Sequence, residues 1–350
     1  MSAWRVIAMV ASTICCRQGA TMETKSATDL KLELATRRAC LLLPADSPEK
    51  RRLDRRVTKG TACMPYPGAY ALAEPYNKLN PRAKARMTLK AIHALHPNWT
   101  FCSFSAAVAH GLQVPRALLA PVHIAISPTE SRRKKPGHIA CHTDHGGSRV
   151  ITDGMPCTCL LQTLLDCLCA TGFRYGLAIV DSALHYHLTT HEKLARHFAD
   201  HGKGRRGIRQ ARQTLAYADG RSENGGESIV RAAIIELGFQ TPELQIEIED
   251  PMNPGAPKRS DMGWRLPNGR YILVELDGLS KYLSTNARTH EEPSVYQAVR
   301  TMRAERLRES HLNLTGATIL RLSFAQALDA DYLFRLLSTA GVPLNKETSS

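Results

Sequence analysis

The sequence predicts a mixed α/β protein: a C-terminal mixed sheet flanked by helices, preceded by a mostly helical region that contains a winged helix. Two observations carry this prediction. Between residues 227 and 340, helical patterns and short runs rich in Ile, Leu and Val follow in the order helix, three strands, helix, strand, helix. Before residue 219, most segments have a helical pattern, and Lys and Arg predominate.

Charge is distributed unevenly along the 350 residues, which are enough for two or three domains. Residues 1–218 hold 31 Lys and Arg against 14 Asp and Glu, whereas residues 219–345 hold 14 against 17. We expect the basic part to attract a polyanion such as DNA, and the acidic part to supply any chemistry. The other interpretation of the basic excess is a solvated surface.

The N-terminal residues and the cysteines indicate a cytoplasmic protein without a membrane partner. The apolar run Val6–Ile14 is too short to span a bilayer. Residues 1–22 are expected to be a disordered extension, with Met22 as an alternative start. Ten irregularly spaced cysteines do not fit a small disulfide scaffold, so reduced thiols are expected.

Residues 23–76 predict a DNA-binding winged helix. Pro48 is suited to the start of a helix and Gly60 to its end. The Pro- and Gly-containing stretch from Cys63 to Leu72 then predicts a hairpin. A plain basic surface helix is the alternative. The candidate DNA-contacting side chains on this helix are Arg51, Arg52, Arg55, Arg56 and Lys59.

Residues 77–218 predict an α-rich middle region. A helix follows Asn80-Pro81 and continues to Leu95, and another begins at Ser103 or Ser105. Residues 160–185 predict a pair of apolar helices, and residues 201–212 a basic linker that leads into a helix. One strand is expected at residues 122–126, because its residues alternate.

Residues 219–345 predict a separate domain with a carboxylate-bearing hairpin. Pro267-Asn268-Gly269 marks a reversal between two apolar runs. A three-residue loop pairs Leu266 with Arg270 and places Asp261 opposite Glu275, on the same face as Asp277. A two-residue loop would place Asp261 on the other face. Three clustered carboxylates require a proton or a hard cation such as Mg²⁺; the alternative is a set of carboxylates at an exposed strand end.

The order and spacing of these motifs resemble the PD-(D/E)XK nuclease superfamily, and more closely its very-short-patch-repair-like branch. The residues that carry this resemblance are Gly226-Glu227-Ser228 with Arg231, Ser260-Asp261, Glu275-Leu276-Asp277-Gly278, Glu305 with Arg308 and Leu312, and Ile319-Leu320-Arg321. The resemblance implies that the C-terminal domain has a restriction-endonuclease-like fold. It also implies a Mg²⁺-dependent DNA endonuclease in which Asp261 and Glu275 bind the metal. Glu227 would add a ligand, or it would form a helix salt bridge with Arg231.

Two positions depart from the superfamily pattern. The Lys expected two residues after Glu275 is Asp277, and the His expected six residues after it is Lys281. Lys281 would orient the attacking water, or the site would have lost its chemistry. The catalytic candidates are therefore Glu227, Asp261, Glu275, Asp277 and Lys281.

A second resemblance concerns the first half of the chain. Phe101–Leu112, Pro121–Ile124 and Thr163–Asp166 look like the abortive-infection type IV antitoxin family. This resemblance implies a non-catalytic transcriptional regulator with a degenerate nuclease fold, and a cognate toxin as partner. These motifs are mostly apolar, so core packing is expected to be their main role. The spacing of Cys141, His142, His145, Cys157 and Cys159 is poor for zinc, and Asp166 is expected to be a hydrogen-bonding residue rather than a catalyst.

Overall fold

The structure is a computed structural model of the whole chain, and it describes residues 26–129, 138–144, 148–277 and 310–345, together with residues 300, 303 and 307. The chain forms two compact units, Met1–Lys78 and Leu79–Ser350. The second unit contains both the middle and the C-terminal regions of the sequence analysis. Within the described residues, no helix combines the length and apolarity needed to cross a bilayer.

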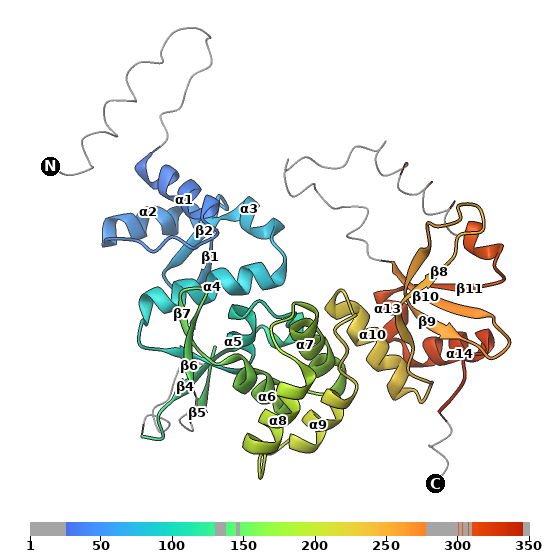
Figure 1. Cartoon of the computed structure of the whole chain (residues 1–350). Helices are drawn as coiled ribbons and strands as arrows, with labels where there is room; N and C mark the ends of the chain where they lie inside the picture. Colours follow the sequence, from blue (N-terminus) through green and yellow to red (C-terminus); the bar gives the residue numbers. More distant parts are fainter. Residues whose placement is uncertain are drawn as a thin grey trace, which may run out of the picture. The chain divides into compact units, whose positions relative to one another are not determined.

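The first unit contains two helices followed by a hairpin (Figure 1). Its elements are α1 (Ala27–Arg37), α2 (Ser47–Thr58), β1 (Ala62–Tyr66), β2 (Ala69–Leu72) and α3 (Ala73–Lys78). Asp46 caps α2 and Gly60 follows its end with a φ of 75°. The basic helix and hairpin therefore occur where the sequence predicts them. Leu32, Leu53 and Tyr70 form the core that joins the elements.

The middle region contains a five-stranded sheet packed with helices, so it is less helical than the sequence predicts. The strand order is β5-β4-β3-β7-β6. The strands are β3 (Thr100–Phe101), β4 (Val122–Ile126), β5 (Ile139–Thr143), β6 (Arg149–Thr152) and β7 (Met155–Thr158). Only β4 was expected.

Helices of the middle region follow the sequence prediction closely. They are α4 (Pro81–Leu95), α5 (Ser103–Ala109), η1 (Arg116–Leu118), α6 (Leu160–Ala170), α7 (Phe173–His185), α8 (His191–His201) and α9 (Ile208–Ala216). Asn80 caps α4, as expected. Cys102, not Ser103 or Ser105, occupies the N-cap position of α5. The helix α8 was not predicted.

The C-terminal region is a four-stranded mixed sheet with the order β11-β10-β9-β8 (Figure 1). Its elements are α10 (Gly225–Glu236), β8 (Glu243–Ile248), β9 (Lys258–Arg265), β10 (Tyr271–Asp277), β11 (Thr318–Ser323), α13 (Phe324–Leu328) and α14 (Ala330–Ala340). The strand β9 is antiparallel to both neighbours, whereas β10 and β11 are parallel. The chain is therefore a mixed α/β protein with mixed sheets flanked by helices.

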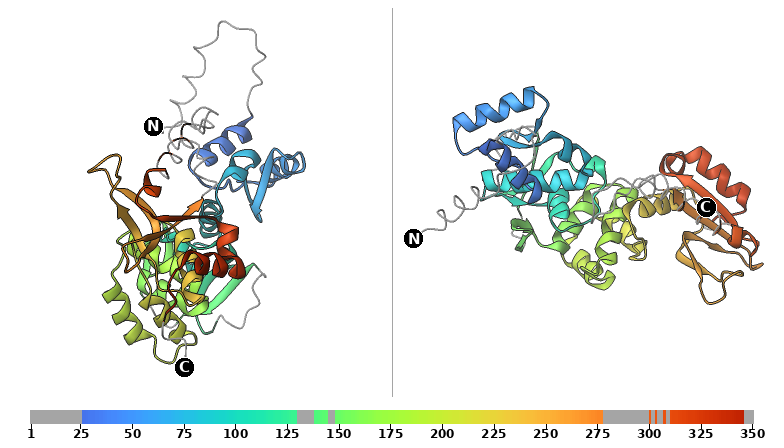
Figure 2. Two further views of the ribbon diagram at one scale, coloured as in Figure 1. Left: turned by 90° about the vertical axis from the view of Figure 1, so that its right-hand side faces the viewer. Right: turned by 90° about the horizontal axis from the view of Figure 1, so that it is seen from above.

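One face of this sheet is covered by α10, α13 and α14, which share a core with it. Val230, Ile234, Leu333 and Leu337 from the helices pack with sheet residues such as Val274. Figure 2 shows α14 along the sheet from two further directions. The opposite face carries a smaller core that contains Leu273 and Leu312; residues 310–313 are helical. The rest of the helix that the sequence predicts between the third and fourth strands lies largely outside the described residues.

Candidate functional site

The hairpin of β9 and β10 has the three-residue loop that the sequence analysis required. The amide of Leu266 donates to the Arg270 carbonyl at 2.8 Å, which leaves residues 267–269 as the loop. Gly269 has a φ of 80°, a conformation that glycine adopts without strain. The paired register of β9 and β10 ends at Met262 and Val274, and continuing it by one residue would place Asp261 opposite Glu275. Directly opposed residues share a face of the sheet.

Asp261 lies where the regular pairing of β9 and β10 ends. The backbone amide of Leu276 donates to Oδ2 of Asp261 at 3.0 Å. The carboxylate thus replaces a backbone acceptor at the point where the two strands separate. Its other oxygen, Oδ1, has no partner among the residues described.

Glu275 is paired with an arginine that the sequence analysis did not assign to the site. Glu275 and Arg321 are register partners on the parallel strands β10 and β11. Nη2 of Arg321 lies 3.4 Å from Oε2 of Glu275, whose side chain is 12% exposed. This separation exceeds that of a tight charge-assisted hydrogen bond, roughly 2.7–2.9 Å. A cation is therefore present beside the carboxylates without any metal.

The alternation along β10 follows the sequence prediction. Ile272, Val274 and Leu276 contact the core beneath α10 and α14, whereas Leu273 contacts the core on the opposite face. Glu275 is two residues after Leu273 in β10, so its side chain lies on the same face of the sheet as Leu273. Asp277 is the last residue of β10, opposite Ser323; its side chain, and Lys281 entirely, lie outside the described residues.

Gln245 on β8 is a polar residue of this region that sequence reasoning missed. By the register of β8 and β9 it falls opposite Asp261, between the pairs Leu244–Met262 and Ile246–Ser260. Its φ is 55°, in the left-handed region that non-glycine residues rarely adopt. Its Nε2 is buried and has no hydrogen-bond partner among the described residues. Backbone strain and unsatisfied polar atoms of this kind concentrate at functional sites.

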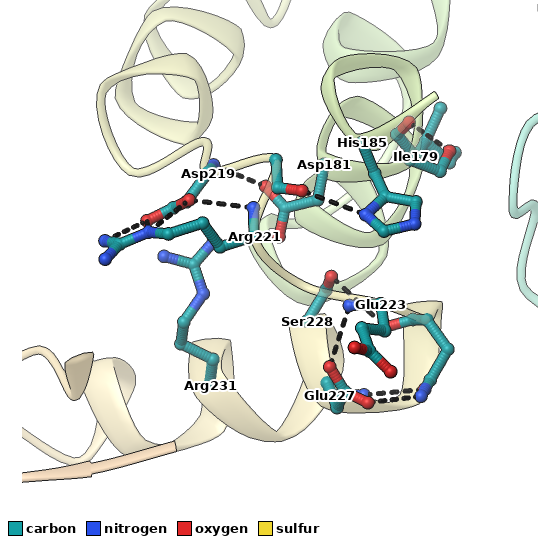
Figure 3. Close-up of polar contacts among 12 residues, drawn as sticks. Ile179, Asp181, His185, Asp219, Arg221, Glu223, Glu227, Ser228 and Arg231 are labelled. Atoms are coloured by element: carbon teal, nitrogen blue, oxygen red, sulfur yellow. Dashed lines mark hydrogen bonds and ion pairs between the residues drawn. The ribbon is translucent and has the colours of Figure 1, made fainter. Parts of the chain in front are cut away.

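Glu227, in the first turn of α10, supports the N-cap of that helix at Asn224 (Figure 3). Its carboxylate accepts hydrogen bonds from the Glu223 amide at 2.8 Å and from the Asn224 side chain at 2.5 Å. Asn224 in turn accepts from the Glu227 amide, so the two residues cap the helix reciprocally. The carboxylate of Glu223 pairs with Arg259, two residues before Asp261. These contacts connect Glu227 to the strand that carries Asp261.

Arg231 does not form the helix salt bridge with Glu227 that its spacing allowed. Its Nη2 donates to Asp181 of α7 at 2.8 Å, with the two side chains 3% and 1% exposed (Figure 3). Asp181 also accepts from the Asp219 amide at 2.8 Å. Burial raises the pKa of Asp181 even though Arg231 and the Asp219 amide oppose this shift. The pair joins α7 to α10. Sequence reasoning could have found it from Asp181, a single carboxylate within the apolar run 177–184.

A hard cation fits the donors that the structure describes. Oδ1 of Asp261 has no hydrogen-bond partner among the described residues, and Oε2 of Glu275 lies 3.4 Å from Arg321. Mg²⁺ is commonly bound by one or two carboxylates, with water and substrate phosphate completing its coordination. No group of three or more His, Cys, Asp or Glu side chains suited to a metal occurs among the described residues. The zinc candidates Cys141, His142, Cys157 and Cys159 were among these residues, whereas His145 lies outside the described part of the chain.

Four of the five cations proposed to contact DNA are exposed on α2. Arg51, Arg52, Arg55 and Lys59 have no carboxylate within ion-pair distance in the described part of the chain. Arg56 differs, because it pairs with Asp29 of α1 and is only partly exposed. Arg56 therefore has a structural role in joining the two helices.

Asp166 is a hydrogen-bonding residue, as expected. It accepts from Gln162 at 2.7 Å and from Arg205 at 2.5 Å. The middle sheet also brings His123 and His142 together, with Nδ1 and Nε2 2.7 Å apart. Burial, and secondly His142, lowers the pKa of His123 to about 4, so the two rings share a hydrogen bond as neutral groups at physiological pH.

Two curated proteins resemble this chain over much of its length. They are uncharacterized proteins from two strains of Mycobacterium tuberculosis, CDC 1551 / Oshkosh and H37Rv. Each is 28% identical over 215 residues, which are 61% of this chain and 74% of the relative. No protein-family model matches the chain.

Proposed function

We propose that this protein binds DNA and that its C-terminal sheet carries a Mg²⁺-dependent site for hydrolysis of phosphodiester bonds. The observation that carries the proposal is the placement of Asp261 and Glu275. They lie on the adjacent strands β9 and β10, just beyond the last pair of the ladder, and Glu275 is beside Arg321. Carboxylate oxygens suit a hard metal ion, and a cationic side chain beside them suits a phosphate group.

The topology of the C-terminal region supports the resemblance to the nuclease superfamily. A helix, three strands that pair in sequence order, and a fourth strand parallel to the third occur in the order that the motifs predicted. The strain at Gln245, opposite Asp261, adds an independent mark of a functional site.

Asp261 and Glu275 would hold the metal, which when bound would supply a Lewis acid and an activated water at the scissile phosphate. Arg321 would contribute positive charge beside the phosphate. The Leu276 amide would orient the Asp261 carboxylate, because it occupies Oδ2 and leaves Oδ1 free. Glu227 would support the site through Glu223 and Arg259.

DNA affinity would come from the basic part of the chain. The exposed cations of α2 recur at helical spacing, and the hairpin follows this helix in the sequence. Such an arrangement suits the phosphate backbone of a duplex.

A non-catalytic, antitoxin-like regulator is the second candidate function. The ion pair of Arg321 with Glu275 favours it, because Arg321 neutralises the carboxylate without a metal. The presence of Asp277 at the position of the superfamily's Lys also favours a non-catalytic regulator. A regulator of this kind would bind DNA and a cognate toxin.

Incubation of supercoiled plasmid with Mg²⁺ tests these alternatives. If the site is catalytic, the wild type nicks the plasmid, while Glu275→Gln and Asp261→Asn lose nicking but keep DNA binding. Glu247→Gln is the matched control, because Glu247 is an exposed carboxylate on β8 of the same sheet. Nicking that survives Glu275→Gln refutes the site, and DNA binding without any Mg²⁺-dependent nicking supports the regulator.

A further inference from the structure

The loop between α8 and α9, residues 202–207, is held in a defined conformation by its two end glycines. A Cβ at Gly207, whose φ is 84°, would lie 2.1 Å from the carbonyl oxygen of Cys169. A Cβ at Gly202 would lie 2.4 Å from the carbonyl oxygen of Phe198. Both distances are far below contact, so only glycine allows this close approach of the loop to α6 and α8.

Arg205 anchors the loop to α6. Its Nη2 donates to Asp166 at 2.5 Å, and its backbone amide donates to the Gly202 carbonyl at 3.1 Å. The Arg205 carbonyl accepts from the Ile208 amide at the start of α9. Arg205 is therefore neutralised by Asp166 and attaches the loop to α6.

The other four cations of the segment have no carboxylate partner among the residues described. They are Lys203, Arg206, Arg209 and Arg212, all of them exposed. The helix α9 buries Ala211, Thr214 and Leu215, which directs Arg209 to the opposite face. Arg212 lies on the flank of α9, where its Nη2 donates to the Phe198 carbonyl of α8 at 3.4 Å. No Asp or Glu occurs between His201 and Ala218.

Three exposed cations on other helices have a carboxylate partner four residues away. They are Lys50 with Asp54, Lys78 with Glu74 and Arg196 with Glu192. The segment from Lys203 to Arg212 lacks such pairing. Four cations held close together repel one another, and a polyanion relieves this repulsion.

We propose that the α8–α9 loop and the exposed face of α9 form a second phosphate-contacting surface for duplex DNA, distinct from α2. This inference rests on the DNA binding of the proposed function but not on catalysis. DNA suits the surface better than a membrane, because no exposed large apolar side chain lies in the loop or in α9. The anchored loop would present its cations with little loss of conformational freedom on binding.

Fluorescence anisotropy with a labelled duplex, measured across a salt series, tests this surface in the full-length protein. The variant Arg209→Ala/Arg212→Ala removes two cations that take part in no ion pair. We expect weaker binding and a salt slope that falls by up to about 1.8, since each lost phosphate contact contributes roughly 0.9. Arg209→Glu/Arg212→Glu should weaken binding further.

A matched control removes the same charge elsewhere in the same unit. Arg116 and Arg335 are exposed and have no ion-pair partner among the described residues, so Arg116→Ala/Arg335→Ala should leave the slope near that of the wild type. Circular dichroism confirms that each variant is folded.

Each remaining outcome identifies which idea fails. If the α9 double variant behaves like its control while substitutions in α2 reduce the slope, the second surface is refuted and DNA binding stands. If the wild type binds no duplex at all, both fail. Tighter binding to single-stranded RNA or to anionic vesicles than to duplex DNA overturns the assignment of the partner.

Discussion

At the scale of single residues, the buried ion pair of Asp181 and Arg231 has the largest expected effect on stability. Removal of one partner leaves a buried charge uncompensated, which costs roughly 3–5 kcal/mol. We therefore expect Arg231→Met to lower the free energy of unfolding by about that amount in urea denaturation, and Asp181→Leu/Arg231→Met to recover most of the loss. Arg174→Met is the matched control, because Arg174 and Glu236 also join α7 to α10 but remain about one-third exposed. The control should lose less than about 1 kcal/mol of unfolding free energy. The prediction would be contradicted if Arg231→Met lost no more than the control.

Glu49 leads to a prediction about pH at the same scale. The Ala45 amide at 2.8 Å, and then Lys31 at 2.7 Å, hold the pKa of this buried carboxyl below its ordinary value. A carboxyl with a lowered pKa stabilises the folded state above its unfolded pKa, about 4.3, and this contribution disappears as pH falls through the folded pKa. Glu49→Gln should therefore cost roughly 1–3 kcal/mol at pH 7 and less at an acidic pH below the unfolded pKa of about 4.3.

Thermal unfolding at the two pH values measures this difference. Glu74→Gln is the control, because Glu74 is an exposed partner of Lys78. A cost of Glu49→Gln that is the same at both pH values would show that its charge does not matter.

At the scale of elements, the start of α9 depends on Gly207. A methyl group there must push α9 away from Cys169, whereas a methyl group at Gly204 meets nothing within 4 Å although its φ is also positive, at 75°. Gly204→Ala should cost only the left-handed penalty of about 1–2 kcal/mol. Gly207→Ala should cost about 1–3 kcal/mol more, because the overpacking is added. Equal shifts in urea unfolding would mean that the α6–α9 contact is easily displaced.

Elements with a strong local pattern could be predicted from the sequence, and elements defined by distant pairing could not. The helix α4 was predicted with its cap at Asn80. The strand β5 was missed because Cys141, His142 and Thr143 are exposed and do not alternate. The closing helix, predicted as one, is divided at Asp329, which ends α13 and caps α14.

The candidate site shows the same limit. The relation of Asp261 to Glu275 depends on a short loop, so the sequence could predict it once the loop length was assumed. Arg321 is in the parallel partner strand, and its register with Glu275 is decided by packing across more than forty intervening residues. Gln245 was missed because backbone strain has no signature in the residue type.

At the scale of the whole molecule, the uneven charge predicts that α2 makes a measurable part of the DNA affinity. Replacement of Arg51, Arg52, Arg55 and Lys59 by Ala should weaken duplex binding and reduce the salt slope by up to about 3.6, roughly 0.9 for each phosphate contact. Arg56 is kept, because its pair with Asp29 joins α1 to α2 and its loss would confound binding with folding. Replacement of Arg82, Arg116, Lys193 and Arg335 by Ala, which removes equal charge from exposed positions of the other unit, is the control. A general electrostatic attraction would make the two variants equivalent, because net charge alone would then decide the affinity. A larger effect at α2 requires that these four side chains contact phosphates directly, since only contacts that release counterions change the slope.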